Sequence, residues 1–332
     1  VHNGFELNEK SIYCSGALLK STFAIQHIGN TYISQYLGDT TNYDIQKAYE
    51  KLYQHLSSVL EFKPEVIVTD KHPNYFSTEF GKQLSEKHHI PLLQVQHHKA
   101  HFASVLAENE LINCDDPVLG VIWDGTGLGD DQQIWGGEFF KYSKNVMKRV
   151  DHFEYFPHIA GDKMANEPRL SALSLSSQNG KDSNYTKDKF TPVEWKIFKQ
   201  KLDLKTQLNT SSVGRLFDAV ASLLGLCNNQ SFEGEAAMIL QSLGEDFYHN
   251  NLNYNAFYDI TKLSGSSIIQ AIIIDLDQGI SPNEIAFKFH LTLVHLVMLI
   301  AKKQRTKHIA FSGGVFQNTL LVDLLIDQSG RD

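Results

Sequence analysis

The stretch Ile122-Trp123-Asp124-Gly125-Thr126-Gly127 ends an apolar run that starts at Val118. The run predicts a buried strand that breaks into a turn at Asp-Gly-Thr-Gly, and we expect residues 134–142 to pair with it across that turn. Glycines let backbone amides approach an anion, and Asp124 can coordinate a cation or position a phosphate-bound metal. An Asp-Gly pair is also a common hairpin signal, so by itself the motif indicates only a turn.

A histidine pair lies about twenty residues upstream, in Val95-Gln96-His97-His98-Lys99-Ala100-His101-Phe102-Ala103-Ser104. His97 and His101 are four residues apart at the start of a predicted helix, which places them on one face. Two imidazole nitrogens can then converge on one metal ion and leave positions for a carboxylate, water or substrate oxygen. The alternative is that both histidines only bond the backbone. Together with the Asp-Gly-Thr-Gly motif, the pair predicts a metal-assisted reaction on a nucleotide-like substrate.

The rest of the chain alternates predicted strands and helices, which indicates an α/β sheet. Ser281-Pro282-Asn283-Glu284 has the pattern of a helix start, and we expect that helix to reach about Lys303. A strand–turn motif occurs once in each half, without an internal sequence repeat. The other expected elements are two strands within 12–28 around a turn at 18–22, helices at 43–60 and 77–88, strands at 66–69, 92–95 and 308–311, strand and loop over 143–160, and a mostly helical region over 161–280 with a polar loop at 177–190.

Three further segments are candidates for nucleotide contacts. Ser312-Gly313-Gly314-Val315-Phe316-Gln317-Asn318 predicts a strand–Gly-Gly–helix junction, where an adenosine can pack on bare backbone and a helix N-terminus favours phosphate. Asp218 lies on a predicted helix beside a buried face, and Glu233-Gly234-Glu235 places glycine between acids at a helix start. The alternatives are a tight turn for the first segment and solvated acids for the others.

Length and composition exclude several classes of protein. A chain of 332 residues suggests two lobes, and a net charge of -8 argues against a general nucleic-acid surface. The three widely spaced cysteines suggest neither a disulfide framework nor a zinc knuckle, so we expect a reducing cytoplasm. The first residues do not resemble a signal peptide. The apolar run 291–301 is too short to span a bilayer, so we expect a buried helix and no membrane association. The ends at Val1 and Asp332 suggest a piece of a larger protein.

Seven segments, in order along nearly the whole chain, resemble the C-terminal domain of HypF, the carbamoyltransferase of NiFe-hydrogenase maturation. They are Tyr32-Ile33-Ser34-Gln35-Tyr36-Leu37-Gly38-Asp39, Asp70-Lys71-His72-Pro73-Asn74-Tyr75-Phe76-Ser77-Thr78, Val95-Gln96-His97-His98-Lys99-Ala100-His101, Asp124-Gly125-Thr126-Gly127 through Ile134-Trp135-Gly136-Gly137-Glu138-Phe139, Ser211-Ser212-Val213-Gly214-Arg215-Leu216-Phe217-Asp218, Phe232-Glu233-Gly234 and Ser312-Gly313-Gly314-Val315-Phe316-Gln317-Asn318.

The resemblance implies a fold similar to the universal tRNA threonylcarbamoyl transferase and to the actin/Hsp70/sugar-kinase superfamily. That α/β fold has two lobes with a nucleotide cleft between them. We expect an N-terminal lobe over 1–115 with the histidine pair. We expect a C-terminal lobe over 116–332 with the nucleotide-binding turns and a helical insertion at about 161–280.

The resemblance also implies roles for individual residues. His97 and His101 match metal ligands for a divalent ion, Fe or Zn, and with Asp124 they form the expected catalytic group. Two departures from the family are visible: an Asn-Asp-Gly-Gly segment that supplies a further metal-ligand Asp does not occur within residues 1–332, and Glu167-Pro168-Arg169 is followed by Leu170 rather than a basic residue. The expected nucleotide contacts are Lys20, Trp123, Asp124, Gly125, Thr126, Gly127, Asp218, Gly234, Gly313, Gly314 and Asn318.

The reaction that the resemblance implies is carbamoyl transfer. In full-length relatives a YrdC-like domain makes carbamoyl-adenylate from ATP and carbamoyl phosphate. The present domain would pass the carbamoyl group to the C-terminal cysteine of HypE, giving a thiocarbamate that is later dehydrated to cyanide. Two alternatives stay open: an O-carbamoyltransferase acting on a small-molecule hydroxyl, and a non-catalytic nucleotide-binding scaffold that docks HypE. A sugar kinase fits less well because it needs no paired histidines beside the phosphate turn.

Overall fold

The computed structural model describes residues 10–178, 184–204, 208–252 and 254–329. The chain divides into two compact units, residues 1–100 and 101–332. The division falls inside a helix, earlier than the expected lobe boundary at residues 115 and 116.

The first unit is built on a five-stranded mixed sheet in the order β3-β2-β1-β4-β5. β1, β2 and β3 form an antiparallel meander, and β4 and β5 run parallel to β1. The predicted strands are confirmed, but β3 was missed because its polar, half-exposed sequence Asn-Thr-Tyr-Ile carries no apolar run. The strands are β1 (Ile12–Cys14), β2 (Ala24–His27), β3 (Asn30–Ile33), β4 (Val66–Asp70) and β5 (Leu92–Val95).

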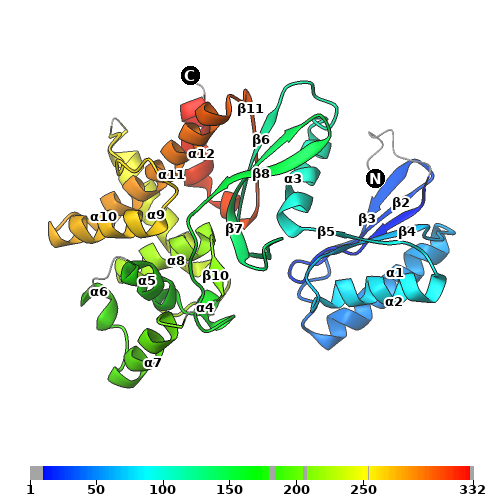
Figure 1. Cartoon of the computed structure of the whole chain (residues 1–332), viewed down its shortest axis with the longest axis horizontal. Helices are drawn as coiled ribbons and strands as arrows, with labels where there is room; N and C mark the ends of the chain where they lie inside the picture. The colour runs from blue at the N-terminus through cyan, green and yellow to red at the C-terminus, as the bar shows by residue number, and fades with distance from the viewer. Residues whose placement is uncertain (1–9, 179–183, 205–207, 253, 330–332) are drawn as a thin grey trace. The chain divides into compact units, whose positions relative to one another are not determined.

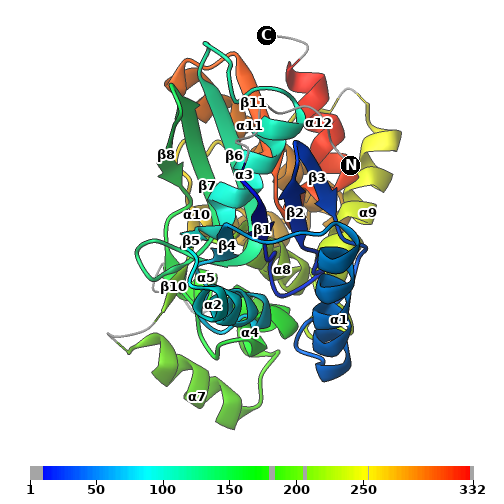
Figure 2. The ribbon, with the colours of Figure 1, turned by 90° about the vertical axis from the view of Figure 1, so that its right-hand side faces the viewer.

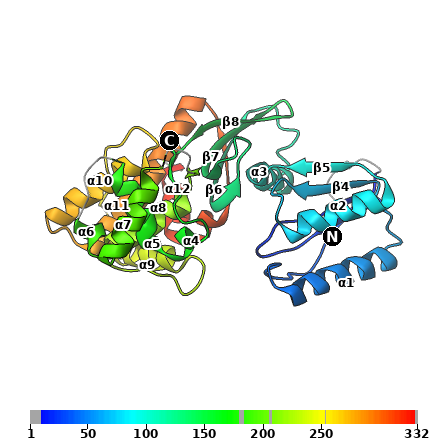
Figure 3. The same ribbon diagram turned by 60° about the horizontal axis from the view of Figure 1, so that its bottom comes forward.

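The two predicted helices, α1 (Tyr43–Val59) and α2 (Phe76–His88), are confirmed, and they cover one face of this sheet (Figure 3). Asn42 caps α1 by accepting a hydrogen bond from the Asp44 amide. An aromatic core fills the space between the helices and the sheet. Its fully buried members include Tyr13, Phe23 and Tyr49.

The second unit contains a six-stranded sheet in which β11, β6 and β7 lie side by side and β8 pairs with β7 (Figure 2). β6 pairs antiparallel with β7 and β7 with β8, while β11 runs parallel to β6. The strands are β6 (Val118–Leu128), β7 (Ile134–Ser143), β8 (Val146–His152), β9 (Phe156–Pro157), β10 (Asn209–Thr210) and β11 (His308–Ser312).

The two sheets share one pattern. In each, a three-stranded antiparallel meander has a fourth strand parallel to its first strand, giving β3-β2-β1-β4 and β8-β7-β6-β11. The protein therefore has the duplicated α/β topology of the actin/Hsp70/sugar-kinase-like fold, and the predicted fold class is confirmed.

β6 does not end at Trp123, and the predicted turn at Asp-Gly-Thr-Gly was wrong. Trp123 pairs with Gly137 and Gly127 pairs with Trp135, so residues 124–126 form a bulge opposite the single residue Gly136. The hairpin turn lies at residues 129–133, where the Gly129 amide donates to the Gln133 carbonyl at 2.8 Å. Cross-strand pairing on both sides of the bulge overrides the local Asp-Gly turn signal. The predicted pairing of the two strands is confirmed.

Helices cover both faces of β6, which explains its unbroken apolar sequence. Leu119 and Trp123 face the large helical core, whereas Val118 and Ile122 face α3 (His97–Glu108). The expected polar loop at 177–190 was wrong in part, since a short helix forms at Asn184–Lys187, and residues 179–183 lie outside the described residues (Figure 1). The predicted helical region as a whole is confirmed, with β10 as the exception. Its helices are α4 (Lys163–Asn166), α5 (Pro168–Ser177), α6 (Asn184–Lys187), α7 (Pro192–Leu202), α8 (Val213–Leu223), α9 (Glu235–Asn250) and α10 (Gly265–Asp277).

Helix α11 (Pro282–Gln304) begins where predicted, with the Ser281 hydroxyl accepting from the Glu284 amide. The whole helix is long and apolar enough to cross a membrane, whereas the apolar run 291–301 within it is too short to do so. However, 72% of its most apolar window is buried inside the protein, as expected of a core helix. After β11, the Gly-Gly junction leads first into a short 3₁₀ helix, η1 (Gly314–Gln317), and only then into α12 (Thr319–Ser329). The predicted direct strand-to-helix turn was wrong on this point.

Candidate metal centre

Helix α3 places His97 and His101 one turn apart on the same face, as their spacing predicts. The buried side chain of Gln96 accepts a hydrogen bond from the Lys99 amide at 3.0 Å and so caps the first turn. The two units divide within this helix, between Ala100 and His101. The continuous helix itself therefore fixes the relation between the two histidines.

The His97 ring is oriented by a carboxylate. His97 Nδ1 lies 2.9 Å from Asp70 Oδ2, at the end of β4, and Asp70 Oδ1 accepts from the His72 amide at 2.8 Å. A carboxylate only accepts, so Nδ1 carries the hydrogen and Nε2 presents a lone pair. This carboxylate–histidine arrangement is the usual support of a metal-binding imidazole.

The His101 ring is held from β11. His101 Nδ1 lies 3.2 Å from the Ser312 hydroxyl, and His101 Nε2 lies 3.5 Å from Asp124 Oδ2. Phe102, the next residue along α3, packs its ring on β6, where a Cβ on Gly120 would come within 2.8 Å of it. This close contact fixes α3 on the sheet beside the bulge.

Asp124 projects from the bulge of β6, and backbone amides hold one of its oxygens. Asp124 Oδ1 accepts from the Gly125 amide at 2.8 Å and from the Gly314 amide at 3.3 Å. Its other oxygen, Oδ2, faces His101. Gly313 must be glycine because its φ is +102° and a Cβ would lie 2.1 Å from the Trp123 carbonyl oxygen.

These contacts bring the predicted catalytic residues together. One atom each of His97, His101 and Asp124 lie within 4.8 Å of one another. All three side chains are partly buried, so solvent or a substrate can reach the group. Two imidazoles and one carboxylate with open positions fit a catalytic divalent ion, such as Fe or Zn.

Asp218 and Arg215 both lie on α8. Arg215 contacts Asp218 and also approaches Gly125 in the bulge. Arg215 Nε is 2.9 Å from Asp218 Oδ2, and Arg215 Nη2 is 4.0 Å from the position of a Cβ on Gly125. Burial raises the pKa of the Asp218 carboxyl to about 6, and Arg215 opposes that rise. Within the described parts of the chain, Arg215 Nη1 has no hydrogen-bond partner, and Asp218 Oδ2 is held by the ion pair with Arg215 Nε.

Gln230 connects Asp218 with the start of α9. Its amide nitrogen lies 3.3 Å from Asp218 Oδ1, and its amide oxygen accepts from the Ala236 amide. Gly234, with a φ of +84°, is the residue that precedes α9. The structure therefore places two of the predicted nucleotide contacts, Asp218 and Gly234, in one neighbourhood.

Other predicted contacts lie elsewhere. The Trp123 ring is fully buried against Phe139, Phe153 and Phe316, so it serves the core. Asn318 is buried as well: its amide nitrogen lies 2.9 Å from His290 Nε2, and its oxygen accepts from the Leu321 amide.

Thr126 is exposed within the bulge, and Gly127 resumes the pairing with β7. Lys20 is exposed in the connection between β1 and β2, with a φ of +51°. The nucleotide contacts expected of these residues, and of Trp123 and Asn318, stay predictions.

Sequence reasoning gave no role to Asp70, Ser312 or Arg215. All three lie within segments quoted above for the family resemblance. Asp70 ends β4, Ser312 ends β11 beside β6, and Arg215 lies one turn before Asp218 on α8. For Asp70 and Ser312 the available signal was a polar residue at the end of a strand parallel to another strand, where functional side chains gather.

Family profiles match almost the whole chain. The profile described as "HypF Kae1-like domain" matches residues 7–108, and the profile described as "Carbamoyltransferase, Kae1-like Domain, second subdomain" matches residues 120–332. The carbamoyltransferase HypF of Synechocystis sp. is 35% identical over 95% of this chain and 43% of its own length. The probable carbamoyltransferase HypF of Methanocaldococcus jannaschii is 30% identical over 98% of this chain and 43% of its own length.

Solved structures agree. A crystal structure of full-length HypF in a phosphate- and nucleotide-bound form has a TM-score of 0.86 at 30% identity, covering 98% of this chain and 52% of that one. HypF of T. kodakarensis has a TM-score of 0.84 at 29% identity, covering 97% and 44%. The chain thus spans about half the length of the relatives it matches. On these matches and on the fold, the chain belongs to the HypF carbamoyltransferase family.

Proposed function

We propose that this chain transfers a carbamoyl group from carbamoyl-adenylate to the C-terminal cysteine of HypE, for the cyanide ligands of NiFe-hydrogenase. The observation that carries the proposal is the convergence of His97, His101 and Asp124 in a chain of the HypF family. The nucleotide-bound HypF relative supports a nucleotide substrate.

In this proposal His97, His101 and Asp124 hold a divalent ion, Fe or Zn. A bound ion supplies Lewis acidity toward the phosphate of the departing AMP. Asp70 and Ser312 orient the two imidazoles, and the amides of the Gly-Gly junction orient Asp124. The chain's own residues thus set the geometry before any substrate binds.

The group transfer is a single displacement. The HypE thiolate sulfur forms a bond to the carbamoyl carbon, the bond between that carbon and the phosphate oxygen breaks, and AMP leaves with the electron pair. Two of the chain's own cysteines do not suit a covalent relay: burial raises the pKa of the Cys14 thiol to about 11 and also raises that of Cys227. All three cysteines are free thiols, which suits a reducing cytoplasm.

The nucleotide is proposed to bind along the bulge, the Gly-Gly junction and the region of Asp218 and Gly234. The unused hydrogen-bond capacity of Arg215 Nη1, within the described residues, supports this, since buried polar groups normally have partners. We also propose Lys20 and Asn318 as nucleotide contacts, on the family resemblance alone. The proposed lobe boundary at residues 115 and 116 and the proposed cleft between the lobes rest on the same resemblance.

The test is ATP binding by calorimetry with added Zn²⁺, comparing the wild-type chain with His97→Ala/His101→Ala. We expect metal-dependent binding in the wild type and a loss of at least about tenfold in affinity in the variant. A matched control is His55→Ala/His249→Ala, which removes two exposed histidines from α1 and α9. Equal binding in the test variant and the control contradicts the metal centre.

The acceptor is tested separately, with carbamoyl-adenylate and either HypE or a sugar. Mass spectrometry of HypE should show a carbamoylated C-terminal cysteine, and the sugar should stay unmodified. Carbamoylation of the sugar alone would favour the O-carbamoyltransferase. Binding of HypE without consumption of carbamoyl-adenylate would favour the scaffold.

A further inference from the structure

The bulge that carries Asp124 faces Gly136 of β7, and neither Gly136 nor the next residue, Gly137, has room for a side chain. A Cβ on Gly136 would lie 2.5 Å from the Asp124 carbonyl oxygen, and a Cβ on Gly137 would lie 2.3 Å from the Ser211 carbonyl oxygen. Both distances are shorter than real contacts of this kind. The backbone of β7 therefore supports the bulge directly.

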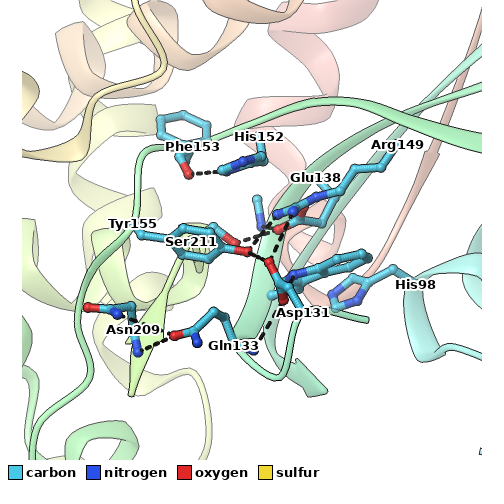
Figure 4. Close-up of polar contacts among 12 residues, drawn as sticks. His98, Asp131, Gln133, Glu138, Arg149, His152, Phe153, Tyr155, Asn209 and Ser211 are labelled. Atoms are coloured by element: carbon cyan, nitrogen blue, oxygen red, sulfur yellow. Dashed lines mark hydrogen bonds and ion pairs between the residues drawn. The ribbon is translucent and has the colours of Figure 1, made fainter. Parts of the chain in front are cut away.

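The next residue on β7, Glu138, is fully buried and accepts from several donors at once (Figure 4). Its Oε1 accepts from the amides of Gly136 and Gly137, both at 3.1 Å, and from the Ser211 hydroxyl. Its Oε2 accepts from Arg149 Nε. Such a buried carboxylate is stable because both of its oxygens meet donors, one of them the charged Arg149.

Arg149 extends this network to the hairpin turn. Its guanidinium carbon lies 3.9 Å from the ring centre of Trp135, and its Nη2 donates to the Tyr155 hydroxyl at 3.1 Å. Tyr155 in turn donates to Asp131 Oδ2 at 2.6 Å (Figure 4). The network thus connects β7, β8 and the turn at residues 129–133.

Ser211 and Ser212 connect the same network to the bulge. Ser211 donates to Glu138, while the Ser212 hydroxyl lies 3.0 Å from the Asp124 carbonyl oxygen and 2.7 Å from that of Gly125. Ser212 also caps α8 by accepting from the Arg215 amide. The bulge is therefore held from the side of α8 and from the side of β7.

We infer that Glu138 is a positioning residue for Asp124: its carboxylate fixes Gly136, Gly137 and Ser211, and these hold the bulge that presents Asp124 to the metal centre. The inference rests on the proposed function for the role of Asp124. Among the described residues, Glu138 bonds Gly136, Gly137, Arg149 and Ser211, and none of these is a candidate ligand. Its effect on metal binding is therefore indirect.

The test substitutes Glu138→Gln, because an amide keeps the size of the side chain but presents only one oxygen acceptor to donors on both sides. Hydrogen–deuterium exchange of the metal-free chain should rise at least about fivefold in peptides covering residues 122–128. Co²⁺ affinity, followed by its visible absorption bands, should fall about tenfold, in line with the effect of outer-layer residues on metal sites. Ser211→Ala, which removes one donor, should change both readouts in the same direction.

Asp275→Asn is the matched control. Asp275 is a buried acid of the same unit, on α10, which pairs with Lys288 and accepts from the Tyr258 hydroxyl. The inference is supported if Glu138→Gln and Ser211→Ala alter the bulge and the Co²⁺ bands while Asp275→Asn alters neither. It is overturned if all three variants change alike, or if bulge exchange stays as in the wild type.

The two proposals fail in different ways. A wild-type chain that binds no Co²⁺ contradicts the metal centre of the proposed function. Exchange at residues 122–128 still decides whether Glu138 holds the bulge, because that readout needs no metal. If Glu138→Gln does not fold, Ser211→Ala gives the decision.

Discussion

Each candidate ligand is oriented by a second residue. A carboxylate holds His97, a hydroxyl holds His101, and two backbone amides hold Asp124. Metal sites depend on such partners, because they fix the ring orientation and the tautomer before the ion binds. The chemistry of this centre is therefore a property of pairs of residues.

Asp70→Asn tests this dependence. The amide keeps the shape but loses the charge that favours a hydrogen on His97 Nδ1, so we expect the affinity for Zn²⁺ to fall about 10- to 100-fold. Calorimetric Zn²⁺ titration measures the effect. Asp39→Asn is the control, because the Asp39 carboxylate accepts from the Thr41 amide at 2.8 Å in the same kind of turn without touching a histidine. An equal loss in both variants would contradict a role of Asp70 at the metal centre.

At the scale of elements, the site depends on close packing of backbone against backbone. The Phe102 ring rests on Gly120, and the Gly-Gly junction after β11 rests on the end of β6. These contacts need glycine because any side chain would occupy the space of a ring or a carbonyl group. They fix α3, β6 and β11 relative to one another, and with them the candidate ligands of the second unit.

Gly313→Ala should destabilise the protein by about 3 kcal/mol, because it combines an unfavourable φ with a collision against the Trp123 carbonyl. Gly279→Ala is the matched control: its φ of +73° is also positive, but a Cβ there meets nothing within 4 Å. We expect only about 1 kcal/mol from that change. Urea unfolding of both variants measures the difference, and equal losses would show that the collision at Gly313 is relieved without cost.

At the scale of the whole molecule, buried neutral histidines couple the stability of the second unit to pH. Burial lowers the pKa of His290 to about 4, and burial with the nearby Arg215 lowers that of His158 to about 4. Both folded-state values lie below the ordinary value of about 6.5. Between pH 6.5 and 4 the unfolded chain binds more protons than the folded chain, so stability falls as pH falls through this window.

Each of these histidines can account for up to about 3 kcal/mol across the full window. His290→Gln should therefore flatten the decline of the unfolding free energy between pH 7 and 5, measured by urea denaturation at each pH. His249→Gln, on the exposed end of α9, is the matched control. A His290→Gln slope equal to that of the wild type would contradict the effect.

The sequence by itself determined most elements and the identity of the ligand candidates. Apolar alternation and continuous apolar runs predicted β4, β5, β6 and the amphipathic α1, because burial of apolar side chains follows local periodicity. The spacing of His97 and His101 placed them on one helix face for the same local reason. Family motifs then indicated the fold class that the duplicated sheets show.

Only the tertiary structure decided how these pieces meet. Whether Asp-Gly-Thr-Gly makes a turn or a bulge depends on pairing with β7 and on Ser212, which lies 88 residues away from Asp124. The partners Asp70 and Ser312, and the burial of Trp123 and Asn318, likewise depend on contacts between distant segments. Local sequence patterns carry no record of such long-range contacts, since their energies arise only when the sheets and helices are packed together.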